Sequence, residues 1–191
     1  MKKHIVTIAG FPGSGKSSAA KSVALRLGYE HFSSGDLFRK MAAERELSIE
    51  EINFTAEKQK EIDIEVDKLL VKMGKEKNNF IIDSRMAFHW IPDSFKVFLA
   101  LNPRIAAERT FAQIRKEGRA SQIGSSIDEV YENTLERVES ERRRYRSLYN
   151  IDVTDKTNFD FIVDAEINNL EEVIKIIVVA YQKWLNTPES K

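Results

Sequence analysis

One short run of residues near the start of the chain restricts the fold more than any other feature of the sequence. An apolar segment, residues 5–9, leads directly into Gly10-Phe11-Pro12-Gly13-Ser14-Gly15-Lys16-Ser17, a complete match to G-x-x-x-x-G-K-[ST]. Glycines in this pattern let successive backbone N–H groups curl around phosphate oxygens at the positive end of a helix. The run therefore predicts a strand, a phosphate-binding loop and a helix, in that order.

Within this loop, Lys16 is expected to reach the β- and γ-phosphates of a bound nucleotide, and Ser17 to offer its hydroxyl to magnesium. The expected ATP-binding residues of the loop are Gly10, Phe11, Pro12, Gly13, Ser14, Gly15, Lys16, Ser17 and Ser18. Two alternatives stay open: a glycine-rich turn that only caps a helix, and a nucleotide-binding module without transfer chemistry. A GTPase is disfavoured, because no Asn-Lys-x-Asp motif follows.

The rest of the chain alternates between strand-like and helix-like segments, which favours a parallel sheet with crossover helices. Strands are predicted at residues 5–9, 29–32, 80–83, 95–101 and 159–163. Helices are predicted at residues 17–27, 36–73 with a break at a capping box near Ser48, 105–149 with a polar break at 118–126, and 169–185. The sequence thus predicts an α/β, three-layer sandwich with a five-stranded parallel sheet.

Composition narrows the possible partners. The 191 residues fit one domain, and 30 Lys and Arg balance 30 Asp and Glu, so no global field draws the protein to nucleic acid or acidic membranes. No cysteine is present and the three histidines lie far apart, which argues against disulfides and a zinc site. The longest late apolar stretch, residues 174–180, is too short to span a membrane. We expect a cytoplasmic protein, a monomer or weak dimer, with small-molecule nucleotides as partners.

Three polar segments follow where strands of such a sheet end, at the edge where ligands of open α/β sheets bind. They are Ser33-Ser34-Gly35-Asp36-Leu37-Phe38-Arg39, Asp83-Ser84-Arg85, and the arginine-rich run from Arg137 to Arg146. Each contains an arginine suited to phosphate.

These motifs, with Glu136–Tyr145, Tyr149–Asp152 and Phe159–Val163, resemble the short, archaeal-type cytidylate kinases of the nucleoside monophosphate kinase group. The resemblance runs nearly end to end. It implies a P-loop NTPase-type fold with a core at about 1–35, 78–105 and 155–185, acceptor-binding helices at about 36–77 and a short lid at about 109–135. It also implies ATP-dependent, magnesium-assisted phosphorylation of a nucleoside monophosphate, foremost CMP or dCMP.

The resemblance also suggests roles for individual residues. Asp83 fits the acid that holds magnesium beside Ser17, although it can also be a simple turn residue, and Glu141 matches an acid on the pyrimidine side. The implied acceptor-binding residues are Ser34, Asp36, Arg39, Arg85, Arg137, Glu141 and Arg144, and the implied catalytic set is Lys16, Arg85, Arg137 and Arg144. Arg109, Arg115 and Arg119 resemble lid arginines, with Arg115 and Arg119 as the expected ATP contacts. Arg137 and Arg144 lie seven residues apart, which places them on one helical face.

Departures from the family leave the acceptor base open. Ser84 replaces a usual glycine, Met86 stands where bacterial relatives often have an acid, and residues 111–134 form a longer segment. Kinases of AMP, UMP, shikimate or dephospho-coenzyme A are alternatives. A nucleotide-dependent regulatory or RNA-binding protein, using the cluster Arg142–Arg144, is an alternative from another class, against which the zero net charge argues. His31, Trp90 and Trp184 are interpreted as packing or surface residues.

Overall fold

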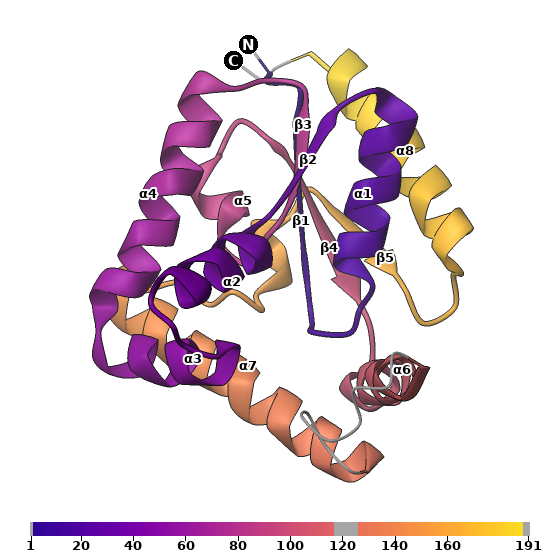
Figure 1. Ribbon diagram of the computed structural model, residues 1–191. Helices are drawn as coiled ribbons and strands as arrows, with labels where there is room; N and C mark the ends of the chain where they lie inside the picture. The colour runs from indigo at the N-terminus through magenta and orange to yellow at the C-terminus, as the bar shows by residue number, and fades with distance from the viewer. Residues whose placement is uncertain (1, 117–125, 189–191) are drawn as a thin grey trace.

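The computed structural model describes residues 2–116 and 126–188. A five-stranded parallel sheet forms the centre of the molecule (Figure 1). The strand order is β2-β3-β1-β4-β5, and every neighbouring pair is parallel. The strands are β1 (Ile5–Gly10), β2 (Glu30–Ser33), β3 (Phe80–Asp83), β4 (Phe95–Ala100) and β5 (Phe161–Asp164). The predicted fold class is confirmed.

The helices connect these strands and lie around the sheet. They are α1 (Lys16–Leu27), α2 (Ser34–Glu44), α3 (Ile49–Lys58), α4 (Lys60–Glu76), α5 (Ala87–Trp90), α6 (Pro103–Lys116), α7 (Ile127–Tyr149) and α8 (Leu170–Asn186), with a 3-10 turn at Lys156–Asn158. The predicted break near Ser48 is confirmed: the Ser48 hydroxyl accepts from the Glu51 N–H at 3.1 Å, and the Glu51 carboxylate accepts from the Ser48 N–H at 2.7 Å. Because this capping box opens α3, the long predicted helical region divides into separate helices.

Several boundaries differ by one to three residues from the predicted ones, and the shifts of β2 and β5 bear on the site. Strand β2 begins and ends one residue later than predicted, because its ladder with β3 pairs Glu30 with Phe80 and Ser33 with Asp83. Strand β5 starts two residues later than predicted, since the Phe159 ring packs on the rings of Phe88 and Phe98, at 4.8 and 5.0 Å between centroids. The first shift brings Ser33 level with Asp83 at the end of the sheet.

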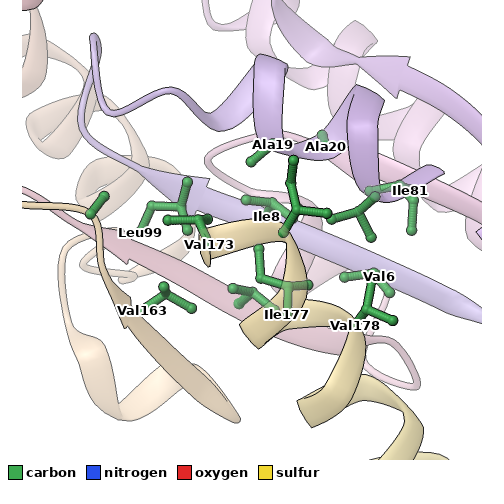
Figure 2. Packing of buried hydrophobic residues seen from close by; sticks show 14 of the residues in the cluster. Val6, Ile8, Ala19, Ala20, Ile81, Leu99, Val163, Val173, Ile177 and Val178 are labelled. Carbon is green, nitrogen blue, oxygen red and sulfur yellow. The ribbon is translucent and has the colours of Figure 1, made fainter. Parts of the chain in front are cut away.

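Alternation along the strands divides the core into two layers. Val6 and Ile8 pack under α1 and α8 on one face of the sheet, while Ile5 packs against α2, α3, α4 and α5 on the other. Figure 2 shows Ala19 and Ala20 of α1 and Ile177 of α8 meeting the first of these layers. This double cover explains why β1 and β3 are apolar along nearly their whole length.

The carboxyl ends of the strands open toward α6 and α7, which pack on each other (Figure 1). Ser126 caps α7 by accepting a hydrogen bond from the Glu129 N–H at 3.2 Å. The rest of the predicted polar break, residues 118–125, lies outside the described residues. Within residues 2–116 and 126–188, no helix is both long and apolar enough to cross a membrane.

Candidate active site

The phosphate loop joins β1 to α1 in a conformation that requires glycine. Gly13 and Gly15 have φ values of 77° and 83°, in the left-handed region that other residues rarely adopt. A Cβ on Gly13 would also lie 2.6 Å from the Ala106 carbonyl oxygen, whereas one on Gly15 would meet open space. Helix α1 begins at Lys16, so its unpaired backbone N–H groups lie at the end of this loop. The loop therefore has the form that binds phosphate.

Lys16 bends back over the loop, where its Nζ donates a hydrogen bond to the Phe11 carbonyl oxygen at 2.8 Å. Burial and the neighbouring Arg85 lower the pKa of Lys16 to about 7, although Asp83 and Glu141 act in the opposite direction. An anion bound in the loop would restore the charged form. Lys16 is thus positioned and electrostatically prepared to take up a phosphate.

Asp83, at the end of β3, collects hydrogen bonds from three polar side chains. The hydroxyls of Ser17 and Ser33 donate to Oδ2 at 2.7 and 3.0 Å, and His31 Nε2 lies 2.7 Å from Oδ1. Burial would raise the pKa of Asp83, but these bonds from His31, Ser17 and Ser33 outweigh it and hold the pKa below its ordinary value. The Asp83 carboxylate is therefore charged beside the first turn of α1.

The interpretation of His31 as a simple packing or surface residue is wrong, because its ring contacts this carboxylate directly. The signal that could have found it is the spacing of two residues between His31 and Ser33. In a strand that spacing places both side chains on one face, level with the end of the neighbouring strand.

A second cleft lies beside the phosphate loop and contains the predicted acceptor arginines. It is lined by Ser34, Gly35, Phe38, Val66, Asp67, Leu70, Ser84, Arg85, Met86, Arg137, Glu141, Arg144 and Tyr145. Arg137 and Arg144 both face it, which confirms that they share a face of α7. Arg85 and Glu141 also line a smaller hollow against Gly10, Phe11 and Pro12. These two residues therefore connect the cleft to the phosphate loop.

Buried carboxylates hold the arginines of this cleft. Glu141 forms ion pairs with Arg85 Nε and, at 3.1 Å, with Arg137 Nε. Arg144 Nε donates to Asp63 Oδ2 at 2.8 Å, and burial, which would lower the pKa of Arg144, is outweighed by the charge of Asp63. Glu141 thus lies among arginines suited to phosphate. Arg85, after β3, and Arg137 and Arg144, on α7, are held in place by these carboxylates.

The remaining predicted residues differ in where they lie. Ser34 lines the cleft, and its hydroxyl donates to the Asp83 carbonyl oxygen at 3.3 Å. Arg39 is exposed and pairs with Asp36 on the surface of α2. Arg109 and Arg115 are exposed on α6, where the Arg115 guanidinium lies 5.8 Å from the Phe111 ring centre. Arg119 lies outside the described residues.

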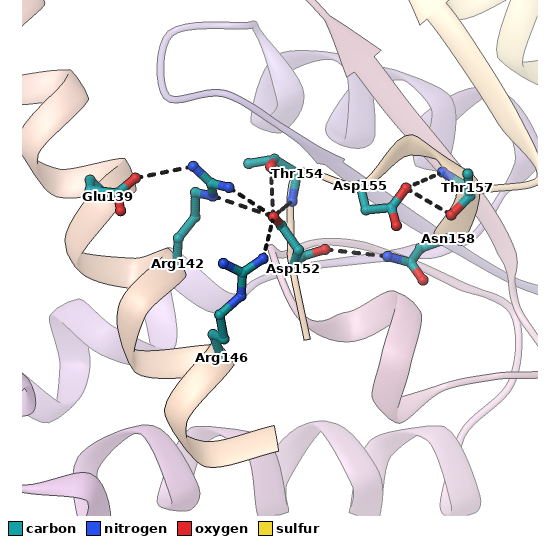
Figure 3. Close-up of polar contacts among 8 residues, drawn as sticks. All are labelled: Glu139, Arg142, Arg146, Asp152, Thr154, Asp155, Thr157 and Asn158. Carbon is teal, nitrogen blue, oxygen red and sulfur yellow. Dashed lines mark hydrogen bonds and ion pairs between the residues drawn. The ribbon is translucent and has the colours of Figure 1, made fainter. Parts of the chain in front are cut away.

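The outer face of α7 holds the following loop in place, as Figure 3 shows. Asp152 accepts from Arg142 Nη2 at 2.8 Å, from Arg146 Nη2 at 3.3 Å and from the Thr154 hydroxyl at 2.6 Å. Hydrogen bonds from Arg142 and Thr154 lower the pKa of Asp152. Val153 and Thr154 line the hollow beside Gly10 and Phe11. Arg142 belongs to the cluster Arg142–Arg144, which was considered for RNA binding. Its contact with Asp152 instead holds the loop that carries Val153 and Thr154 beside the phosphate loop.

Comparisons with known proteins agree with this geometry. A family model described as an AAA domain matches residues 9–155. The chain is 33% identical to the cytidylate kinase of Methanosarcina barkeri, over 92% of this chain and 94% of that protein, and 34% identical to the cytidylate kinase of Pyrococcus abyssi, over 92% of each. Among solved structures, a shikimate kinase from Bacteroides thetaiotaomicron superposes with a TM-score of 0.63 at 17% identity, over 96% of this chain and 98% of that one. A gluconokinase from Sinorhizobium meliloti gives 0.59 at 13%, over 96% and 94%.

Proposed function

We propose, because this chain belongs to the cytidylate kinase family, that it transfers the γ-phosphoryl group of ATP to the phosphate of CMP or dCMP. The observation that carries the proposal is the continuity of the two sites. Arg85 and Glu141 line both the hollow at the phosphate loop and the arginine-lined cleft. A donor phosphate in the loop and an acceptor phosphate in the cleft would therefore meet beside Arg85.

The reaction needs alignment and charge neutralisation more than proton transfer. The acceptor phosphate is already anionic, so a strong general base is unnecessary and no covalent enzyme intermediate is required. Lys16 stabilises the donor phosphates, while Arg85, Arg137 and Arg144 hold the acceptor phosphate and the charge that develops during transfer. Glu141 and Asp63 keep these arginines oriented through the contacts described above.

Magnesium fits the residues at the start of α1. The Ser17 hydroxyl and the Asp83 carboxylate lie 2.7 Å apart there, and oxygen atoms of this kind are the ligands that magnesium prefers. No cluster of three or more His, Cys, Asp or Glu suited to a metal occurs in the part of the chain that the structure describes, so phosphates and water are left to complete the coordination. Magnesium bound there neutralises charge on the phosphates. His31 and Ser33 hold Asp83 for this role.

The division into a core, acceptor-binding helices at about 36–77 and a lid at about 109–135 belongs to the same proposal. Contacts of Arg115 and Arg119 with the ATP phosphates stay predictions, as do acceptor contacts of Ser34, Asp36 and Arg39. Arg115→Ala and Arg119→Ala test the contacts with ATP, because loss of a phosphate contact raises the KM for ATP. Arg39→Ala tests the acceptor contact of Arg39, because its loss would raise the KM for CMP.

The experiment for the whole proposal measures ADP formation from ATP and magnesium with CMP, dCMP, UMP, AMP, GMP, shikimate or dephospho-coenzyme A, beside a control without acceptor. Lys16→Ala is expected to abolish turnover, while Lys21→Ala, on the exposed side of α1, is expected to retain it. Turnover that depends on CMP or dCMP and is lost only in Lys16→Ala supports the proposal. Preference for another acceptor refutes the cytidylate assignment, and absence of acceptor-dependent ADP formation refutes the kinase reaction in this chain.

A further inference from the structure

The acceptor cleft changes its electrostatic character along its length. Arg85 and Glu141 line both the cleft and the hollow at the phosphate loop, and Arg137 pairs with Glu141, which places these groups at the donor end. Asp67, on α4, lines the same cleft, but it accepts a hydrogen bond from Tyr149 and lines a separate hollow together with Trp90 and Tyr149. The cleft therefore has a cationic end beside the phosphate loop and an end farther away that carries the Asp67 carboxyl.

Asp67 is buried, with 4% of its surface exposed, and its carboxyl is held by neutral groups. The Tyr149 hydroxyl donates to Oδ2 at 2.8 Å, and Trp90 packs edge-on against the Tyr149 ring at 5.0 Å between centroids. Burial raises the pKa of Asp67 to about 6, while the hydrogen bond from Tyr149 lowers it and the nearby Asp63 raises it. Burying a carboxylate that has no cationic partner costs folding free energy.

The other acidic groups of this region already have cationic partners. Glu141 is paired with Arg85 and Arg137, and Asp63 with Arg144. The contacts of Asp67 described above are neutral, so its negative charge is the one best placed to act on a ligand.

The walls next to Asp67 are apolar and suit a flat ring. Phe38 of α2, Leu70 of α4 and Met86 after β3 line the cleft with it. An acceptor whose phosphate lies among the arginines would place its base at this end. The base would then be sandwiched by apolar side chains and face one carboxylate, an arrangement in which a single polar group decides between bases of equal shape.

We propose that Asp67 makes this enzyme prefer cytosine over uracil, by accepting a hydrogen bond from the exocyclic amino group of cytosine. A carboxylate accepts from that amino group, whereas the carbonyl oxygen that uracil has at the same position is an acceptor and is repelled. The inference rests on the proposed nucleoside monophosphate kinase function and assigns its choice of pyrimidine to a residue of α4.

Asp67→Asn tests the inference, because an amide has nearly the same shape and can still accept from Tyr149 while its NH2 group can donate to the uracil oxygen. The measurement is kcat/KM for CMP and for UMP. We expect the CMP-to-UMP ratio to fall by about tenfold or more, through loss with CMP and gain with UMP, the range expected for one base-reading contact. Glu65→Gln, on an exposed position of the same helix, is the matched control and should leave the ratio unchanged.

Two further measurements separate base reading from a structural role. Thermal unfolding of each variant reports folding, and Asp67→Glu keeps the charge but displaces it, so it should lower turnover of CMP without any gain with UMP. An unchanged ratio in a folded Asp67→Asn variant, or an equal loss with both acceptors, overturns the inference and leaves the kinase function intact. A wild-type enzyme that prefers UMP, or that uses neither acceptor, overturns the proposed cytidylate function itself.

Discussion

Replacing Glu141 with Gln should reveal how strongly the acceptor arginines depend on a buried counter-charge. Glu141 is 4% exposed and is paired with Arg85 and with Arg137. Glutamine keeps the size of the side chain and removes its charge. The substitution therefore leaves two guanidinium groups and Lys16 close together without the carboxylate between them.

The magnitude follows from the exposure of the partners. Removing one member of a fully buried ion pair costs about 3–5 kcal/mol of folding free energy. The Arg85 and Arg137 side chains are 21% and 45% exposed, so water solvates part of their charge, and we expect a smaller loss of about 2–3 kcal/mol. For a chain of this size, that loss corresponds to a melting temperature lower by about 4–12 °C.

The assay is urea unfolding of the ligand-free protein, with and without inorganic phosphate. Glu139→Gln is the matched control, because Glu139 lies on the exposed side of the same helix and pairs with Arg142. Phosphate should stabilise Glu141→Gln more than the wild type, since the anion supplies the missing negative charge and binds the native state. The reasoning is refuted if the variant unfolds at the wild-type urea concentration, or if phosphate stabilises both proteins equally.

Four further predictions concern the donor side. Because the pKa of Lys16 is lowered to about 7 from 10.5, ATP binding at pH 8 to 9 should take up as much as one proton, which calorimetry in buffers of different ionisation enthalpy would detect and Lys16→Ala should abolish. Between pH 7 and 10.5 Lys16 therefore binds more protons in the unfolded state than in the folded state. The free energy of unfolding of the protein without nucleotide should consequently rise with pH across this range, which urea titrations can check. Gly13→Ala should lose ATP affinity and about 1–3 kcal/mol of stability, whereas Gly28→Ala, whose Cβ meets open space, should keep its ATP affinity in a binding titration. Asp152→Asn should raise the KM for ATP severalfold and that for CMP less, because Asp152 fixes the loop with Thr154; equal changes in both would contradict this, and Asp155→Asn is the control.

The phosphate loop was predictable because the residues that define it are consecutive in the sequence. The spacing of Gly10, Gly15 and Lys16 fixes a turn, a helix start and a cation within eight consecutive residues, so no distant contact is needed to recognise it. Most of the strands were predictable for a similar reason, since β1, β3, β4 and β5 are short, largely apolar runs between turn residues. Helix α5 was not, because four residues cannot display a helical period.

The roles of individual polar residues were harder to predict where they depend on contacts between distant segments. His31 and Asp83 lie 52 residues apart, and Asp63 and Arg144 lie 81 apart, so their pairing follows only from the sheet register and from the packing of α4 near α7. Arg39 illustrates the reverse case. It belongs to a motif that resembles the family, yet it pairs with its neighbour Asp36 at the surface.

These pairings also explain how a chain with zero net charge can bind two highly anionic substrates. Lys16, Arg85, Arg137 and Arg144 gather at the carboxyl edge of the sheet, and buried carboxylates hold the three arginines there: Glu141 for Arg85 and Arg137, and Asp63 for Arg144. Repulsion among the cations is thereby offset before a substrate arrives, and the arginines keep the orientation that a phosphate needs. The arrangement separates local from global charge, because a cationic phosphate site exists in a chain whose net charge is zero.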